Sequence, residues 1–130
     1  FITKHREPGK IDKFETGAVL YRLDTRYTDR FNLLTRVDDN AALAVATGAD
    51  LSPDGRFLAV IGYTDLWLFE KPVNSDQWLS GTAYRLPLPR RESKQVEAVT
   101  WDNNEQLVIG NEEGELYRVA RQSVPLYRPK

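Results

Sequence analysis

The sequence has no cysteine, no methionine and only one histidine, His5, among its 130 residues. Without cysteine the chain has no disulfide bonds, no thiolate nucleophile and no cysteine-ligated zinc. A single histidine excludes a metal site built on two histidines of one chain. We also expect no serine hydrolase triad, because its base would have to be His5, close to the first residue. Glycine-rich phosphate-binding motifs are absent as well.

Charge of either sign is not in excess, since 18 Lys and Arg residues balance 19 Asp and Glu residues to a net charge of −1. Both signs are scattered, so the broad basic field of a nucleic-acid-binding surface is missing and no nucleic-acid partner is expected. No apolar run is long enough to predict a membrane span. The sequence begins with Phe1 and not with Met, which leads us to expect a piece of a longer protein.

The chain does contain many short segments rich in β-branched and aromatic residues, which have the length and composition of β-strands. Between them lie turn sequences such as Ser52-Pro53-Asp54-Gly55, because Gly and Asn tolerate a positive φ and Pro favours a turn. Helical periodicity is nearly absent, and only Asn40–Val45 is alanine-rich enough to predict a helical turn. The predicted strands are residues 18–23, 31–37, 57–61, 66–69, 96–101, 106–109 and 116–119.

Two patterns recur along the chain. An apolar–aromatic–x–apolar pattern occurs at Leu20–Leu23, at Leu66–Phe69 and at Leu116–Val119. The segment Gly48–Val60 aligns with Glu97–Ile109 at an offset of 49 residues. A period of roughly 40–50 residues with about four short strands per unit is typical of a β-propeller blade. The alternative is an ordinary antiparallel sandwich, whose strands also follow one another at short, regular intervals.

The stretch Ser52–Val60, SPDGRFLAV, followed by Asp65–Phe69, DLWLF, resembles the blade motif of the TolB-like and WD40-like propeller repeats of bacterial secreted and periplasmic proteins. The later repeat departs from this motif, with Trp101-Asp102-Asn103-Asn104 in place of the turn tetrapeptide, and the earliest repeat lacks the tetrapeptide. The resemblance implies a propeller fold and a location in the periplasm or outside the cell. It specifies a fold and not an activity.

We therefore predict an all-β chain that forms a partial β-propeller of about three four-stranded antiparallel blades. The single domain, residues 1–130, is expected to comprise an incomplete blade (1–41), two further blades (46–91 and 95–121) and a tail (122–130). In the incomplete blade, residues 2–4 and 18–23 would be middle strands closed by residues 31–37. The tail would trail off or pair with another chain. Because closed propellers have 4–8 blades, another chain or a second copy is expected to complete the ring.

The candidate site residues follow from this arrangement, since the first strand of each propeller blade lines the central channel. Asp50 and Glu97 fall on these strands. Resemblance to gluconolactonase, paraoxonase and phytase-like propellers implies calcium held by such acidic residues, although calcium needs six to eight oxygen ligands. Alternatively, the two carboxylates accept hydrogen bonds from the backbone. Further binding candidates at the rim, or else solvated loop residues, are Tyr63, Asp65, Asn111 and Glu112.

Two further features are candidate contacts for a partner, and the first of them, Trp78, lies outside the repeat. Trp78 is the aromatic residue that we expect to be available for a partner, whereas the recurring aromatics are expected to pack between blades. The second feature is a basic run, which consists of Arg85, Arg90, Arg91 and Lys94. These side chains either bind an acidic partner or phosphate, or form a hydrated loop without a partner.

The predicted function is that of a non-enzymatic binding or scaffold module of a secreted or periplasmic bacterial protein. The alternative is a calcium-dependent hydrolase of the lactonase, esterase or phytase-like kind, with Asp50 and Glu97 among the metal ligands. No cofactor other than calcium is expected.

Overall fold

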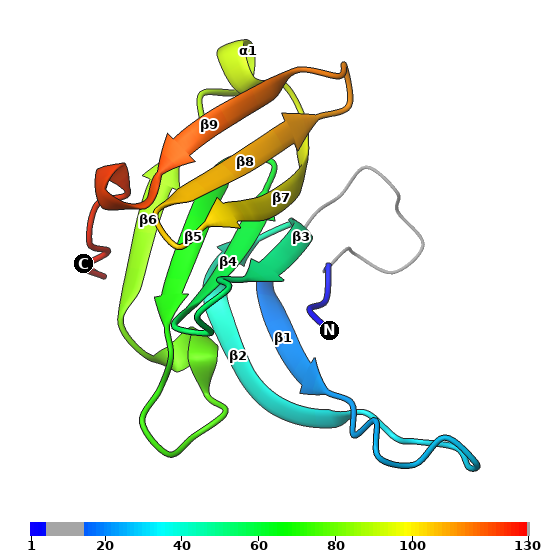
Figure 1. The fold of residues 1–130 in the computed structure, drawn as a ribbon. Helices are drawn as coiled ribbons and strands as arrows, with labels where there is room; N and C mark the ends of the chain where they lie inside the picture. The colour runs from blue at the N-terminus through cyan, green and yellow to red at the C-terminus, as the bar shows by residue number, and fades with distance from the viewer. Residues whose placement is uncertain (5–14, 130) are drawn as a thin grey trace.

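The computed structural model describes residues 1–4 and 15–129, and this part of the chain is all-β, as predicted. Three antiparallel sheets follow one another along the chain, in the orders β1-β2, β3-β4-β5-β6 and β7-β8-β9. No sheet closes on itself within the described residues. The strands are β1 (Thr16–Arg22), β2 (Thr35–Ala44), β3 (Ala46–Leu51), β4 (Phe57–Gly62), β5 (Asp65–Glu70), β6 (Ala83–Pro87), β7 (Val96–Asn103), β8 (Gln106–Asn111) and β9 (Leu116–Ala120) (Figure 1).

Helical structure is limited to three short elements in the described residues: the helix α1 (Arg90–Ser93) and the 3-10 turns η1 (Trp78–Ser80) and η2 (Arg121–Ser123). None of these is long or apolar enough to cross a membrane.

The middle sheet, β3–β6, includes the two strands predicted at residues 57–61 and 66–69, which are β4 and β5, and it has the four strands predicted for a blade. Its first hairpin is closed by Ser52, whose hydroxyl oxygen accepts hydrogen bonds from the amides of Arg56 (3.1 Å) and Phe57 (2.9 Å). The Ser52 hydroxyl also donates to Asp54 (2.6 Å). Gly55 adopts φ 68°, in the left-handed region that favours glycine. The Ser-Pro-Asp-Gly tetrapeptide is thus a turn, as expected.

The third sheet has three strands and not the four that were predicted. Its first hairpin turns at Asn103, whose side-chain oxygen accepts from the amide of Glu105 (2.9 Å). The neighbouring Asn104 side chain accepts from the amide of Asp54 (3.0 Å), in the equivalent turn of the middle sheet. The two turns that align in sequence therefore lie side by side.

The first sheet differs most from the prediction. It has two strands, β1 and β2, and Ile2 adds a single bridge to Leu20. Phe31 and Leu33 were expected in a strand but lie outside it and are almost fully exposed. The predicted helical turn at residues 40–45 is wrong, because β2 extends through Ala44 and pairs with β1. Pairing with another strand and burial of Leu43 override the weak helical preference of the alanines.

A single residue, Val45, joins β2 to β3. It adopts φ 48°, a conformation that is unfavourable for a β-branched residue. Gly62 faces this corner, and a Cβ atom there would lie only 2.5 Å from the carbonyl oxygen of Ala44. Glycine is therefore required where the first sheet meets the middle sheet.

The prediction that the tail trails off or pairs with another chain is also wrong. Beyond η2, Leu126 forms an antiparallel bridge with Tyr84 of β6, in the same chain. The segment therefore covers the outer edge of the middle sheet, because β6 leaves backbone groups there that an extended segment satisfies.

The hydrophobic core has two parts, one on each face of the middle sheet. Along β4, Phe57, Ala59 and Ile61 belong to the part shared with the third sheet, and Leu58 and Val60 belong to the part shared with the first sheet. Alternation of side chains along a strand produces this division. The middle sheet is thus a layer between the other two, which lie towards opposite ends of the molecule in Figure 1.

Each sheet packs one particular face against the next sheet along the chain. The leucines at equivalent positions of the three repeats show this. Leu20 of the first sheet packs against the middle sheet, and the equivalent Leu66 of the middle sheet packs, fully buried, against the third sheet. The next equivalent, Leu116, is 74% exposed, since no sheet covers it in the described part of the chain. Near it on the same strand, Arg118 binds Asp102 (2.7 Å). Each sheet therefore turns the same face towards the next sheet along the chain.

We predict that Leu66→Ala lowers the free energy of unfolding by about 2–5 kcal/mol, because it leaves a cavity between the middle and third sheets. The matched variant Leu116→Ala removes the same atoms from the equivalent exposed position and should change the stability by less than about 0.5 kcal/mol. Urea denaturation followed by tryptophan fluorescence measures both. Equal losses in the two variants would contradict this stacking order.

Candidate functional site

The strands β3 and β7 lie side by side and run in the same direction without forming a backbone ladder. The Thr47 hydroxyl donates to the carbonyl oxygen of Val96 (3.0 Å). A Cβ atom on Gly48 would lie 3.2 Å from the carbonyl oxygen of Glu97, so the approach is close. These partners are 49 positions apart in the sequence, which is the offset of the repeat. Equivalent positions of two repeats are thus neighbours in space.

Asp50 joins these two strands. Its carboxylate oxygen Oδ2 accepts hydrogen bonds from the amide of Trp101 (2.9 Å) and the hydroxyl of Thr100 (3.0 Å). Its carbonyl oxygen accepts from the indole nitrogen of Trp101 (3.2 Å). The structure therefore shows the backbone-binding role that the sequence left open for this carboxylate.

Glu97 lies elsewhere along the strand pair. It precedes Thr100 by three residues, which corresponds to about 10 Å of strand rise. Its exposed side chain accepts a hydrogen bond from the hydroxyl of Tyr63 (3.3 Å), which is not a partner of Asp50. Within residues 1–4 and 15–129, no group of three or more His, Cys, Asp or Glu side chains is arranged to hold a metal ion.

The structure brings two predicted site residues together in what we call the tyrosine cluster: Lys4, Tyr63 and Glu97. The Lys4 ammonium group donates to the Tyr63 hydroxyl oxygen (2.9 Å) and lies 4.5 Å from the centre of the Tyr63 ring. Tyr63, in the turn between β4 and β5, is half-buried. The cluster places a phenol between a cation and a carboxylate at one end of β3 and β7. The sequence did not predict the contribution of Lys4, whose approach depends on tertiary structure.

Asp65, a predicted rim residue, is buried and fully engaged. One carboxylate oxygen accepts from Arg85 Nε (2.7 Å) and the other from the hydroxyl of Thr64 (2.7 Å). The hydrogen bond to Asp65 raises the pKa of Arg85, whose guanidinium also lies 5.3 Å from the centre of the Trp67 ring. Arg85 and Lys94, two members of the predicted basic run, therefore bind different acidic residues, since Lys94 binds Glu113 (2.6 Å).

Asn111, also predicted at the rim, closes the turn between β8 and β9. Its side-chain oxygen accepts from the amides of Glu113 (3.1 Å) and Glu115 (2.9 Å), and its side-chain nitrogen donates to the Glu115 carboxylate (2.7 Å). This bond, together with one from the Tyr117 hydroxyl (2.9 Å), lowers the pKa of Glu115. The neighbouring Glu112 remains exposed and accepts from the side chain of Gln95.

A groove that the sequence did not predict lies between the first sheet and the inner edge of the middle sheet. It consists of two adjoining hollows of about 450 and 290 Å³. Trp78, the aromatic residue expected to be available for a partner, lines the smaller hollow, and Asp50 lines the larger one. The residues that line the groove come from distant parts of the chain, so no local sequence pattern predicts the groove. Both hollows share the apolar residues Phe1, Leu20, Leu51 and Leu58.

His5 lies outside the described residues. Of the predicted candidates, Tyr63 and Glu97 form a polar cluster at the end of the strand pair, and Glu112 is exposed. The other three, Asp50, Asp65 and Asn111, are held by hydrogen bonds within the fold.

We predict that Asp50→Ala lowers the free energy of unfolding by about 1–3 kcal/mol, because it leaves the amide of Trp101 without its partner. Asp50→Asn keeps an acceptor oxygen and should lose less. As a control, Glu97→Gln changes an exposed side chain and should alter the stability by less than about 0.5 kcal/mol. Chemical denaturation of the three variants gives the comparison, and an Asp50→Ala protein as stable as the wild type would exclude the bridging role.

A second prediction concerns acid pH. Because the pKa of Glu115 is lowered in the folded chain, its ionised form stabilises the fold above the pKa of the unfolded chain, and this contribution is lost as the pH falls through the folded pKa. Carboxyl-carbon NMR titration should give Glu115 a midpoint below its usual range. Tyr117→Phe should raise that midpoint partly, and Asn111→Ala should raise it further. A midpoint unaffected by either variant would refute this assignment.

Comparison with known proteins gives no relative from which a site could be transferred. No family model matches the chain, and no curated protein and no solved structure matches it. Its function must therefore be inferred from the contacts and burial of its own residues.

Proposed function

We propose that this chain is part of a β-propeller that serves as a non-enzymatic binding or scaffold module of a secreted or periplasmic bacterial protein. The observation that carries this proposal is the side-by-side, parallel placement of β3 and β7 with partners 49 positions apart. Equivalent first strands of neighbouring blades have this relation in a propeller. In a two-sheet sandwich, each sheet buries one face against the other, whereas the middle sheet here is buried on both faces.

The direction of stacking also supports a propeller. Head-to-tail contacts between repeats generate a ring when the rotation between them closes. The three sheets are fewer than the 4–8 blades of a closed ring, so we propose that another chain or a second copy completes it. The face that carries Leu116 is the one that a further blade would cover, because its equivalent in the middle sheet is covered in this way. The location outside the cytoplasm is supported only by the resemblance of the Ser52–Phe69 motif.

The binding surface that we propose is the end of the stack that carries the tyrosine cluster. The turn that holds Tyr63 and the turn closed by Asn111 lie at equivalent positions of the two repeats, and Glu97 lies between them at the start of β7. Rigid sheets hold these turns at fixed positions, which is how such scaffolds present binding groups. A polar partner would meet an ammonium group, a phenol and a carboxylate here.

The alternative proposal, a calcium-dependent hydrolase, would use Asp50 and Glu97 as ligands. Calcium needs six to eight oxygens, so the missing blades would have to supply most of them. Asp50 would also have to exchange its bond to the amide of Trp101 for a bond to the metal.

Calcium titration separates the two proposals. We expect millimolar calcium chloride to leave the melting temperature of the completed ring, the chain together with the copy or chain that closes it, unchanged, because a binding module of this kind holds no resident ion. A site with a dissociation constant below the calcium concentration would raise the melting temperature through preferential binding to the folded state. A calcium-dependent rise that disappears in Glu97→Gln would overturn our proposal in favour of the hydrolase. Magnesium chloride at equal ionic strength is the control for a general salt effect.

A further inference from the structure

The face of the third sheet that points away from the middle sheet carries polar side chains where the middle sheet is apolar. By the repeat alignment, Gln106 occupies the position that Phe57 has in the middle sheet. In the same way, Arg118 occupies the position of Leu68. Phe57 and Leu68 belong to the part of the core shared with the third sheet. Arg118 is instead exposed and donates to Asp102 (2.7 Å) and to the side-chain oxygen of Gln106 (3.5 Å).

The face of the first sheet that points away from the middle sheet also carries an ion pair. Tyr21 aligns with Trp67, which packs towards the first sheet, so Tyr21 lies on the side away from the middle sheet. On β2, Arg36 lies opposite Tyr21 and Asp39 lies opposite Val19, which places both on that same face. Arg36 donates to Asp39 (2.7 Å), and their side chains are 60% and 59% exposed.

The contacts between sheets within the chain follow one rule. The face that carries the recurring leucine packs against the face of the next sheet that carries the recurring aromatic residue. Leu20 and Trp67 accordingly belong to one part of the core. Leu66 and Tyr117 belong to the other part. A leucine-bearing face is therefore matched to an aromatic-bearing face at both contacts.

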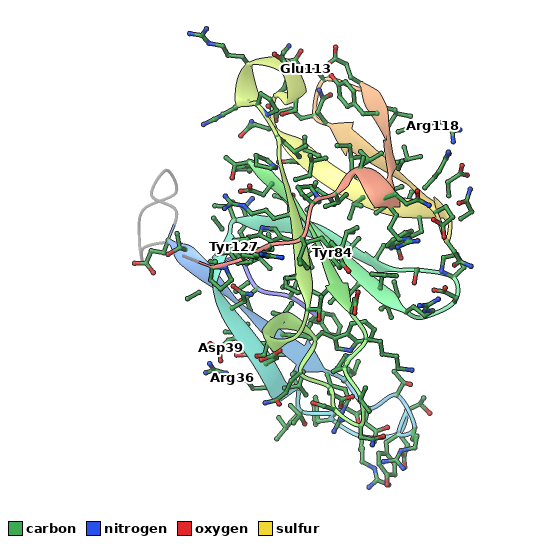
Figure 2. The ribbon with its side chains drawn as sticks, turned by 90° about the vertical axis from the view of Figure 1, so that its left-hand side faces the viewer. Arg36, Asp39, Tyr84, Glu113, Arg118 and Tyr127 are labelled. Atoms are coloured by element: carbon green, nitrogen blue, oxygen red, sulfur yellow. The ribbon has the colours of Figure 1, made fainter. Side chains whose placement is uncertain are left out.

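Two faces that fit this rule have no partner sheet in the described part of the chain. The free face of the third sheet carries Leu116, and the free face of the first sheet carries Tyr21. They lie towards opposite ends of the molecule, as Arg118 and the pair of Arg36 and Asp39 show in Figure 2. A second copy of the chain presents the matching face to each of them.

We propose that the free face of the third sheet binds the free face of the first sheet of a second copy, and that ion pairs close the seam between them. This inference rests on the proposed propeller, whose missing blades it assigns to a second copy. Leu116 would pack against Tyr21 of the second copy. Two copies would contribute six sheets, which lies within the 4–8 blades of a closed ring. Head-to-tail contacts of this kind form a ring when the rotation between units closes.

The charges on the two free faces are complementary. Arg118 would meet Asp39 of the second copy, and in the same seam Asp102 would meet Arg36. The contacts between sheets within the chain are built on apolar side chains, whereas this seam would be largely polar. Attraction between exposed charges weakens as salt is added. The ring should therefore open at its two seams when the ionic strength rises.

The first test is sedimentation velocity of the full chain, residues 1–130, at one high protein concentration and two salt concentrations. Between about 0.1 M and about 1 M sodium chloride the Debye length falls from about 10 Å to about 3 Å. We expect mostly dimer at the lower salt concentration and mostly monomer at the higher one.

The second test inverts the ion pairs. Arg118→Asp combined with Asp102→Arg keeps the pair within the sheet and the net charge, but it places like charges across the seam, so we expect the dimer to be lost. Adding Arg36→Asp with Asp39→Arg inverts the facing pair as well and should restore the dimer. Circular dichroism checks that each variant folds. If an inverted variant does not fold, a wild-type dimer that is insensitive to salt still refutes the ionic seam.

A matched control inverts the ion pair of Lys94 and Glu113, beside the turn after β8. Lys94→Glu with Glu113→Lys should leave the dimer intact.

The outcomes separate this inference from the propeller proposal. A wild-type monomer at low salt would overturn the second copy as the occupant and assign the polar face to a solvated end of the stack, while a ring completed by another chain would still stand. A dimer that survives the first inversion, or that the fourfold variant does not restore, would refute the ionic seam. Oligomers that lengthen with protein concentration and disappear on inversion would support the seam but refute the closed ring, because a ring of two copies stops at the dimer.

Discussion

Burial of both faces of the middle sheet is the constraint on which the rest of the structure depends. All six residues of β4 are buried, so this strand is a continuous apolar sequence and not an alternating one. A sheet with two apolar faces requires a layer on each side, which the first and third sheets provide. The hydrogen bonds of Asp50 and Thr47 then fix how the third sheet lies on the middle one. The tyrosine cluster exists because this arrangement brings β7 beside the turn after β4.

Much of the local structure could be predicted from the sequence, since it depends on residues close together in the chain. The central strands of the middle sheet, the strands of the third sheet and the turn at Ser52–Gly55 follow from β-branched and aromatic residues and from turn chemistry. The errors arose where distant segments decide the outcome. Residues 40–44 form a strand because β1 pairs with them, and the tail is ordered because β6 offers an unpaired edge. Neither partner is visible in the local sequence of the segment concerned.

The site was harder to predict for the same reason. Asp50 and Glu97 were chosen as one pair because both fall on first strands, yet each has a different partner. Asp65 and Asn111 looked like exposed loop residues, but an arginine 20 positions away and the atoms of a tight turn engage them. The contact of Tyr63 with Glu97 and the apolar groove beside Trp78 depend on sheet stacking. Residue type indicated which groups were polar, whereas only the fold determined which of them meet.

The corner at Val45 determines how the layers respond to change. One residue in an unfavourable backbone conformation, packed against Gly62, is the whole connection between β2 and β3. Because the connection is one residue long, the end of β2 fixes where β3 begins. The position of the first sheet therefore determines the position of the start of β3. The groove, which residues 49–51 of β3 help to line, and the tyrosine cluster, which lies at the turn after β4, are therefore both positioned by strands that meet at this corner.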